Sequence, residues 1–173
     1  MIVVVMGASG VGKTTVGVAL ARRLGWPFLD ADDFHPAANV EKMRRGAPLT
    51  DDDRRPWLDA IGRELARRAA EGDDVVLACS ALRRWHRDAL RAGARGADVR
   101  FAYLRAEYDE IDRRLRARTG HFMPESLLRS QLDTLEPPDP AEALAVDAAA
   151  PVDAIVEAIA RGLTLLPAAQ WQS

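Results

Sequence analysis

Short apolar runs alternate with amphipathic segments along almost the whole chain. Five runs have the length of a strand, the last of them weakly, and they cover residues Ile2–Val5, Trp26–Leu29, Val75–Cys79, Val99–Leu104 and Leu144–Val146. Between them the apolar positions recur at helical spacing, which predicts helices over Lys13–Leu24, Pro36–Arg45, Asp53–Glu71, Leu82–Arg91, Tyr108–Ala117, Pro124–Leu132 and Val152–Leu165. The tail, 167–173, has no such pattern, and we expect it to be disordered.

This alternation predicts an α/β fold, in which a five-stranded parallel sheet is covered by helices on both faces. The first strand, the first helix and the second strand fit within about 30 residues, the length of a right-handed βαβ unit. Ligands of such sheets gather at the carboxyl ends of the strands. The segments that follow strands are therefore expected at one edge, and they are Gly7–Gly12, Asp30–Asp33, Ser80 and Arg105.

Composition narrows the class of protein. The chain has 173 residues, enough for a single domain over 1–173, with 24 basic and 26 acidic side chains and a formal net charge of −2. This balance argues against binding to a nucleic-acid backbone, which usually needs a basic excess. No apolar run approaches the roughly 20 residues that span a bilayer, so no membrane segment is predicted.

Cysteine and lysine are both scarce in this chain. Cys79 has no partner for an internal disulfide, which favours a reducing compartment, and we expect a cytoplasmic protein. Lys13 and Lys42 are the only lysines; the other basic residues are arginines, a bias that we treat as background. A position that keeps lysine against this bias is a candidate for chemistry that requires an ammonium group.

A phosphate-binding loop follows the first strand. The residues Gly7, Ala8, Ser9, Gly10, Val11, Gly12, Lys13 and Thr14 match the pattern G-x-x-x-x-G-K-[ST] between a strand and a helix, and Thr15 comes next. The glycines let successive N–H groups converge on phosphate oxygens at a helix N-terminus. Lys13 supplies a charge for the β- and γ-phosphates of a nucleotide, and Thr14 an oxygen for Mg²⁺. The alternative is a glycine turn that only caps the helix.

An acidic residue is needed beside this loop. The strand Val75–Cys79 is followed by Ser80 instead of the carboxylate that many P-loop ATPases use for magnesium, and no N-K-x-D motif for reading guanine is present. Asp32 is the best candidate, both to orient or deprotonate an acceptor hydroxyl and to help hold Mg²⁺. The alternative is an acidic cap for the next helix, and it applies with more force to Asp30 and Asp33.

Longer blocks of the chain resemble the gluconokinases of the small P-loop type. The blocks are Phe28–Pro36 (FLDADDFHP), Asn39–Met43 (NVEKM), Pro48–Arg54 (PLTDDDR) with Pro56–Leu58, Cys79–Leu82 (CSAL) with Arg87 and Leu90–Arg91, Arg114–Leu115 with Arg118–Met123 (RTGHFM), and Gln131 with Thr134–Glu136. The resemblance implies a fold similar to nucleoside-monophosphate and shikimate kinases. It also implies MgATP-dependent phosphorylation of D-gluconate to 6-phospho-D-gluconate, which feeds the pentose phosphate pathway, and a homodimer.

The resemblance assigns a set of polar residues to the substrate. A sugar acid offers a carboxylate and a row of hydroxyls, so its pocket needs cations together with neutral donors and acceptors. The assigned residues are Asp32, His35, Lys42, Arg54, Ser80, Arg83 and His121. For each of them a solvated charge or a structural hydrogen bond is the alternative. The family usually has lysine at the position of Arg83 and often tyrosine at that of His86, and a planar guanidinium is not equivalent to an ammonium.

A lid is predicted around residues 114–124. Arg114 and Arg118 lie four apart on one helix face, where they would reach the ATP phosphates, with Gly120 as a hinge and His121 facing the substrate. Closure of such a lid excludes water, which otherwise competes as an acceptor. Arg118 completes a predicted catalytic set with Lys13 and Asp32. The alternative is a solvated basic helix.

Three functions are compatible with these features. The leading prediction is a gluconate kinase. The second is a related small-molecule kinase of the shikimate or nucleoside-monophosphate type, and the third is a nucleotide-binding regulatory module without turnover. The joint presence of Lys13, Thr14, Asp32 and Arg118 argues against the third, because a module without turnover has no need of all four.

Overall fold

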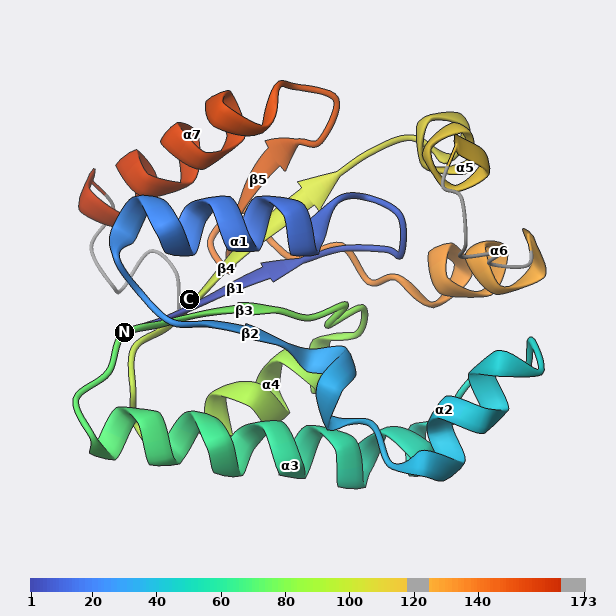
Figure 1. Cartoon of the computed structure of the whole chain (residues 1–173), viewed down its shortest axis with the longest axis horizontal. Coiled ribbons are helices and arrows are strands. Elements are labelled where there is room, and N and C mark those ends of the chain that lie inside the picture. The colour runs from blue at the N-terminus through green and yellow to red at the C-terminus, as the bar shows by residue number, and fades with distance from the viewer. Residues whose placement is uncertain (118–124, 166–173) are drawn as a thin grey trace.

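A computed structural model describes residues 1–117 and 125–165 of the chain. Five parallel strands form one sheet, and they are β1 (Ile2–Met6), β2 (Phe28–Asp30), β3 (Val75–Ala78), β4 (Val99–Arg105) and β5 (Ala143–Asp147). Their order across the sheet is β2-β3-β1-β4-β5 (Figure 1). The predicted α/β fold with a five-stranded parallel sheet is confirmed.

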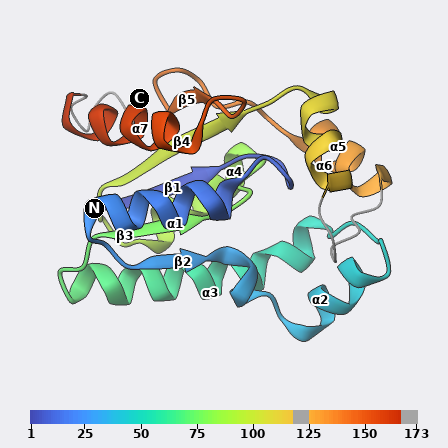
Figure 2. The same cartoon turned by 45° about the horizontal axis from the view of Figure 1, so that its top comes forward.

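Helices cover both faces of this sheet. They are α1 (Lys13–Leu24), η1 (Ala31–Phe34, a 3₁₀ helix), α2 (Ala37–Arg44), α3 (Asp51–Ala70), α4 (Arg84–Gly93), α5 (Tyr108–Ala117), α6 (Glu125–Thr134) and α7 (Val152–Leu165). Helices α1 and α7 lie on one face, and α3 and α4 on the other (Figure 1). Helices α5, α6 and α2 all lie at the end of the molecule to which the strands point (Figure 2).

The central strand β1 connects the two halves of the core. Its residues Ile2, Val4 and Met6 are fully buried in a cluster with α3 and α4, while Val3 and Val5 are buried in a cluster with α1 and α7. A strand that is apolar on both faces is what a parallel sheet covered by two helical layers requires. The core therefore fixes the phosphate loop, which begins directly after Met6.

Several predicted boundaries differ from the structure by one or two residues, and the contacts of the chain explain two of these differences. One short element was not predicted. Strand β2 begins at Phe28 instead of Trp26, because the Trp26 N–H donates back to the end of α1, to the carbonyl of Ala21. Helix α3 begins two residues earlier than predicted, because Thr50 and Asp53 form a reciprocal capping box. The 3₁₀ helix η1 is too short to give a periodic signal.

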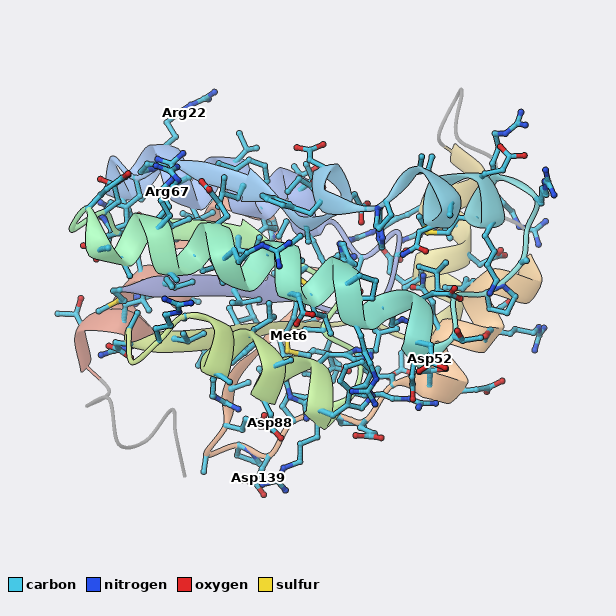
Figure 3. The ribbon with its side chains drawn as sticks, turned by 90° about the horizontal axis from the view of Figure 1, so that it is seen from below. Met6, Arg22, Asp52, Arg67, Asp88 and Asp139 are labelled. Carbon is cyan, nitrogen blue, oxygen red and sulfur yellow. The ribbon has the colours of Figure 1, made fainter. Side chains whose placement is uncertain are left out.

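Figure 3 views the layer of α3 and α4 from below. Asp52 lies at the α3 end near α2, and Arg67 lies toward the opposite end of the same helix. Acidic residues in the first turn and basic residues in the last turn complement the helix dipole. No helix among the described residues is both long and apolar enough to cross a membrane. The predicted tail and residues 118–124 of the predicted lid lie outside the described residues.

Candidate active site

The phosphate loop adopts a backbone that its glycines make possible. Gly7, Gly10 and Gly12 have φ angles of 141°, 84° and 105°, a region that other residues rarely adopt. A Cβ at Gly7 would lie 2.8 Å from the carbonyl oxygen of Leu104 on the neighbouring strand β4. The loop thus lies against the carboxyl end of the sheet, and its last residue precedes the first turn of α1.

The side chains of Lys13 and Thr14, in the first turn of α1, each have a hydrogen-bond partner. Lys13 Nζ donates to the Ala8 carbonyl at 3.0 Å, across the loop. Thr14 Oγ1 donates to Asp30 Oδ2 at 2.9 Å, and Asp30 Oδ1 accepts from the Asp32 N–H at 3.1 Å. The threonine predicted to serve the metal is therefore paired with Asp30, a residue for which the sequence favours neither a cap nor a functional role.

Asp32 and the loop share one large cleft. Its volume is about 710 Å³, and its lining comes from the phosphate loop, η1, α2 with the loop after it, the start of α3, the end of β3, α5 and α6. Among the residues predicted for substrate and metal, Thr14, Asp32, His35, Arg54 and Ser80 line it together with Lys13. Lys42 and Arg83 are not among the lining residues. The structure thus brings most of the predicted set to one edge of the sheet.

Lys42 and Arg83 are both ion-paired to the first turn of α3. Lys42 Nζ lies 2.5 Å from Asp53 Oδ2, and Arg83 Nη1 lies 2.8 Å from Asp51 Oδ2. The hydrogen bond from Lys42, reinforced by those from Thr50, lowers the pKa of Asp53 to about 2. In this structure both cations therefore hold the start of α3, from which Arg54 faces the cleft.

His35 is packed into the wall of the cleft. Its ring stacks on Trp57 with centroids 4.4 Å apart and planes 10° from parallel. Trp57 is held in turn by its Nε1–H, which donates to the Ala31 carbonyl at 2.7 Å. Burial lowers the pKa of His35, and the nearby Asp32 opposes this shift. The imidazole is therefore mostly neutral at pH 7.

Arg54 has a backbone anchor inside the cleft. Its Nη1 donates to the Leu49 carbonyl at 2.5 Å and lies 3.8 Å from Asp51 Oδ1. Burial lowers its pKa, although the nearby Asp51 opposes the change. A guanidinium stays charged in any protein environment, so Arg54 presents a fixed, half-buried positive charge to an anionic ligand.

Two residues beyond the sheet contact the phosphate loop. Arg114 of α5 donates to the Val11 carbonyl at 3.0 Å and to the Ala148 carbonyl at 2.6 Å. Gln131 of α6 accepts from the Ser9 N–H at 2.8 Å. Sequence reasoning gave Gln131 no role, since no spacing signal connects residues this far apart. Arg118 and His121 of the predicted lid lie outside the described residues, and so does the hinge Gly120.

His86 and Cys79 are buried close to the cleft. His86 Nδ1 accepts from the Arg83 N–H at 3.2 Å and so caps α4. Burial, together with positive neighbours led by Arg54, lowers the pKa of His86 to about 4. Burial raises the pKa of the Cys79 thiol to about 12, so the thiol stays protonated at neutral pH. Neither group provides a reactive nucleophile or a general base at neutral pH.

The fold and the loop together define a P-loop kinase. Residues 2–138 match the family described as "AAA domain". The chain is also similar in fold, at 16% identity and a TM-score of 0.59, to a shikimate kinase from Aquifex aeolicus vf5, with 95% of this chain and 96% of that one covered. The predicted likeness of fold to shikimate kinases is thereby confirmed.

Closer relatives define the family. The chain is 46% identical to a protein named "Probable gluconokinase" from Xenopus tropicalis, with 92% of this chain and 91% of that one covered. It is 48% identical to a gluconokinase from Sinorhizobium meliloti 1021 of known structure, with 94% and 90% of the two chains covered and a TM-score of 0.82. The chain belongs to the gluconokinase family.

Proposed function

We propose that this protein transfers the γ-phosphoryl group of ATP to a hydroxyl of D-gluconate, forming ADP and 6-phospho-D-gluconate. Membership of the gluconokinase family over nearly the whole chain is the observation that carries this proposal. The cleft supports it, because a phosphate loop, an exposed carboxylate and a fixed arginine line the same cavity. A cavity of about 710 Å³ is within the range that binds small molecules.

The phosphate loop binds the nucleotide in the proposed reaction. Its N–H groups surround the phosphates, and the Lys13 ammonium turns from the Ala8 carbonyl to the β- and γ-phosphate oxygens. Arg114 contacts the same loop, because its guanidinium donates a hydrogen bond to the Val11 carbonyl. In the proposed closed state, Arg118 of the lid adds a second guanidinium as negative charge redistributes in the transition state.

The residues around Thr14 fit a magnesium ion. Thr14 offers a hydroxyl, Asp30 offers the carboxylate that accepts from it, and Asp32 offers a second carboxylate in the same cleft. Mg²⁺ prefers such oxygen ligands. We assign Thr14 and Asp32 to the metal shell, and add Asp30 because of its hydrogen bond to Thr14. The ion neutralises charge on the phosphates when bound.

Asp32 acts on the acceptor hydroxyl in the proposed reaction. Its carboxylate accepts the proton of the gluconate hydroxyl while that oxygen bonds to the γ-phosphorus and the bond to the ADP oxygen breaks. Arg54 faces the sugar-acid carboxylate, and Ser80 offers a hydroxyl or backbone group to the substrate hydroxyls. Lys42 and Arg83 act through the α3 start that they hold, and His121 approaches the substrate from the lid.

A coupled assay that follows ADP formation tests this function. Purified protein is supplied with MgATP and, in separate reactions, gluconate, other aldonic acids, shikimate and nucleoside monophosphates. We expect turnover with gluconate at a kcat/KM well above that of every other acceptor. Preferred turnover of shikimate or of a nucleoside monophosphate would replace the proposed substrate, and turnover of none of them would favour a binding module.

Assembly and location belong to the same proposal. The family resemblance supports a homodimer, which light scattering coupled to size exclusion would report as twice the chain mass. The single buried cysteine supports a reducing, cytoplasmic setting, because a chain with one cysteine forms no internal disulfide in an oxidising compartment. Cell fractionation would test that location.

A further inference from the structure

The side chain of Asn39 fixes the protonation pattern of its neighbour His35. Asn39 is buried, and its Nδ2 donates to the carbonyl oxygen of Asp53 at 2.8 Å. Turning the amide over would place two oxygens against each other, so the nitrogen must face this carbonyl. The same Nδ2 lies 3.5 Å from Nδ1 of His35 and has a second hydrogen to offer it.

This contact selects one tautomer of the imidazole. A nitrogen that accepts a hydrogen bond carries no proton, so Nδ1 of His35 is the bare nitrogen and Nε2 carries the hydrogen. The ring has little freedom to turn over, since it is stacked on Trp57 and its side chain is only 5% exposed. His35 thus presents a fixed Nε2–H donor at the wall of the cleft.

That donor faces Asp32. The two residues are three apart across the turn of η1, and the His35 N–H donates to the Asp32 carbonyl at 3.3 Å. The Nε2 atom of His35 lies 3.9 Å from Oδ1 of Asp32, whose side chain is 87% exposed. This distance exceeds a hydrogen bond in the open site, and catalytic hydrogen bonds commonly tighten only when the substrate is bound.

We propose that His35 is the positioning residue of Asp32, and that its Nε2–H donates to one carboxylate oxygen so that the other faces the acceptor hydroxyl. The stacked ring of Trp57 and the amide of Asn39 hold the donor in place. This inference rests on the proposed function, and it gives His35 a different role from the direct substrate contact that the sequence predicts. A misoriented base of this kind costs about tenfold to a hundredfold in rate.

Two side chains that replace different nitrogens of the ring test the proposal. In His35→Gln, the amide nitrogen reaches the place of Nε2 and keeps the donor, whereas in His35→Asn it reaches only the place of Nδ1. We expect His35→Asn to lower kcat about tenfold to a hundredfold, with KM for gluconate nearly unchanged, and His35→Gln to recover most of kcat. In an Asp32→Asn background, His35→Asn should lower kcat little further, because the carboxylate that His35 positions is already absent.

A raised KM for gluconate at unchanged kcat would overturn the proposal in favour of direct substrate contact. Equal losses of kcat in both variants would overturn it in favour of ring shape alone. Circular dichroism and nucleotide binding of each variant identify any loss that is due to misfolding.

A second measurement does not depend on turnover. The chain has three histidines, and nitrogen-15 NMR of their rings in the full-length protein reports the tautomer of each. The signal of His35 is assigned by its absence in His35→Asn. We expect the Nε2–H form, and a proton on Nδ1 would overturn the proposal. If gluconate proves not to be the substrate, this spectrum still decides the orientation of His35, and the kinetic comparison is made with the acceptor that is turned over.

Discussion

Asp30 and Asp32 show how far two nearby carboxylates can differ in their surroundings. Asp30 accepts hydrogen bonds from the Thr14 hydroxyl and from the Asp32 N–H, so both of its oxygens are engaged. The Asp32 side chain instead extends into the cleft and is largely exposed. An engaged carboxylate suits a structural or metal-shell role, while a free one suits proton transfer. Both carboxylates belong to the proposed metal shell, but only Asp32 also has an oxygen available to accept the hydroxyl proton.

We expect Asp32→Asn to keep nucleotide affinity and to lower kcat by about a hundredfold or more, because the amide cannot accept the hydroxyl proton. Asp30→Asn is the matched variant: it should weaken Mg²⁺-dependent nucleotide binding, because its amide is a poorer metal ligand. Steady-state kinetics and titration with a fluorescent ATP analogue measure both effects. Near-normal turnover in Asp32→Asn would remove this residue from the mechanism.

His86 makes stability depend on pH. Its pKa is about 4 in the folded protein against an ordinary value of 6.5, so the unfolded chain binds the proton first as the pH falls. The free energy of unfolding should therefore be highest above pH 6.5 and decrease by up to about 3 kcal/mol between pH 6.5 and pH 4 on this account.

In His86→Asn an amide oxygen takes the place of Nδ1, so the cap on α4 is kept while the titrating ring is removed. Urea unfolding between pH 4 and pH 7 should show a shallower pH slope for the variant than for the wild type, even though loss of the ring lowers its overall stability. Equal slopes in the two proteins would show that His86 is not the titrating group.

At the scale of elements, α3 and α4 are packed together through two glycines. A Cβ on Gly93 would lie 2.7 Å from the Cα of Gly62, and a Cβ on Gly62 would lie 2.9 Å from the Cα of Gly93. The close contact matters for the site because Arg54 lies near the start of α3, and Ser80 comes shortly before α4. The ion pair between Arg83 and Asp51 joins the same two helix ends.

We expect Gly93→Ala to destabilise the fold by about 1–3 kcal/mol, because the helices must move apart to admit the methyl group. The gain in helix propensity offsets only part of this cost. Gly62→Ala should act similarly, and the double variant should cost less than the sum, since one displaced helix already makes room. Urea denaturation of the wild type, the two single variants and the double variant measures these free energies of unfolding. Strictly additive losses would contradict the shared contact.

The elements and the loop were predictable from the sequence because they depend on local pattern. Apolar spacing indicated every strand and α-helix, and the contiguous motif Gly7–Thr14 indicated the phosphate loop. The pairing of side chains was not predictable, because it depends on how distant segments meet. Gln131 contacts Ser9 across 122 positions, and Arg83 meets Asp51 across 32. Lys42 shows the same limit. Because lysine is rare in this chain, its presence suggested a direct role in the site, but its ammonium group is paired with Asp53.

At the scale of the whole molecule, the cleft is lined by segments that are far apart in the sequence. The phosphate loop follows the buried strand β1, and α2 and η1 line another wall of the cleft. Arg114 of α5 and Gln131 of α6 form hydrogen bonds with the loop. A nucleotide that contacts several of these segments binds the folded chain and not the unfolded one. Binding should therefore stabilise the molecule as a unit.

We expect a non-hydrolysable ATP analogue with Mg²⁺, at about a hundred times its Kd, to stabilise the protein by about 2.7 kcal/mol and to raise Tm by about 5 °C or more. Lys13→Ala should lose most of this shift and most of the turnover, because the phosphates lose their ammonium contact. Thermal unfolding followed by circular dichroism measures the shift in Tm. An unchanged shift in Lys13→Ala would undermine the assignment of the phosphate loop.

The two lysines also determine how this protein can be handled. Amine-directed dyes, cross-linkers and sensor surfaces react with side-chain ammonium groups, and here those are Lys13, in the nucleotide loop, and Lys42, bound to Asp53 beside the cleft. Cys79 offers no substitute, because it is buried. Coupling through either lysine would therefore block or distort the site under study, and the remaining amine is the α-amino group of Met1, which is ion-paired with Asp74. A cysteine introduced on the exposed side of α7, on the opposite face of the sheet from α3, would attach the molecule with its cleft free.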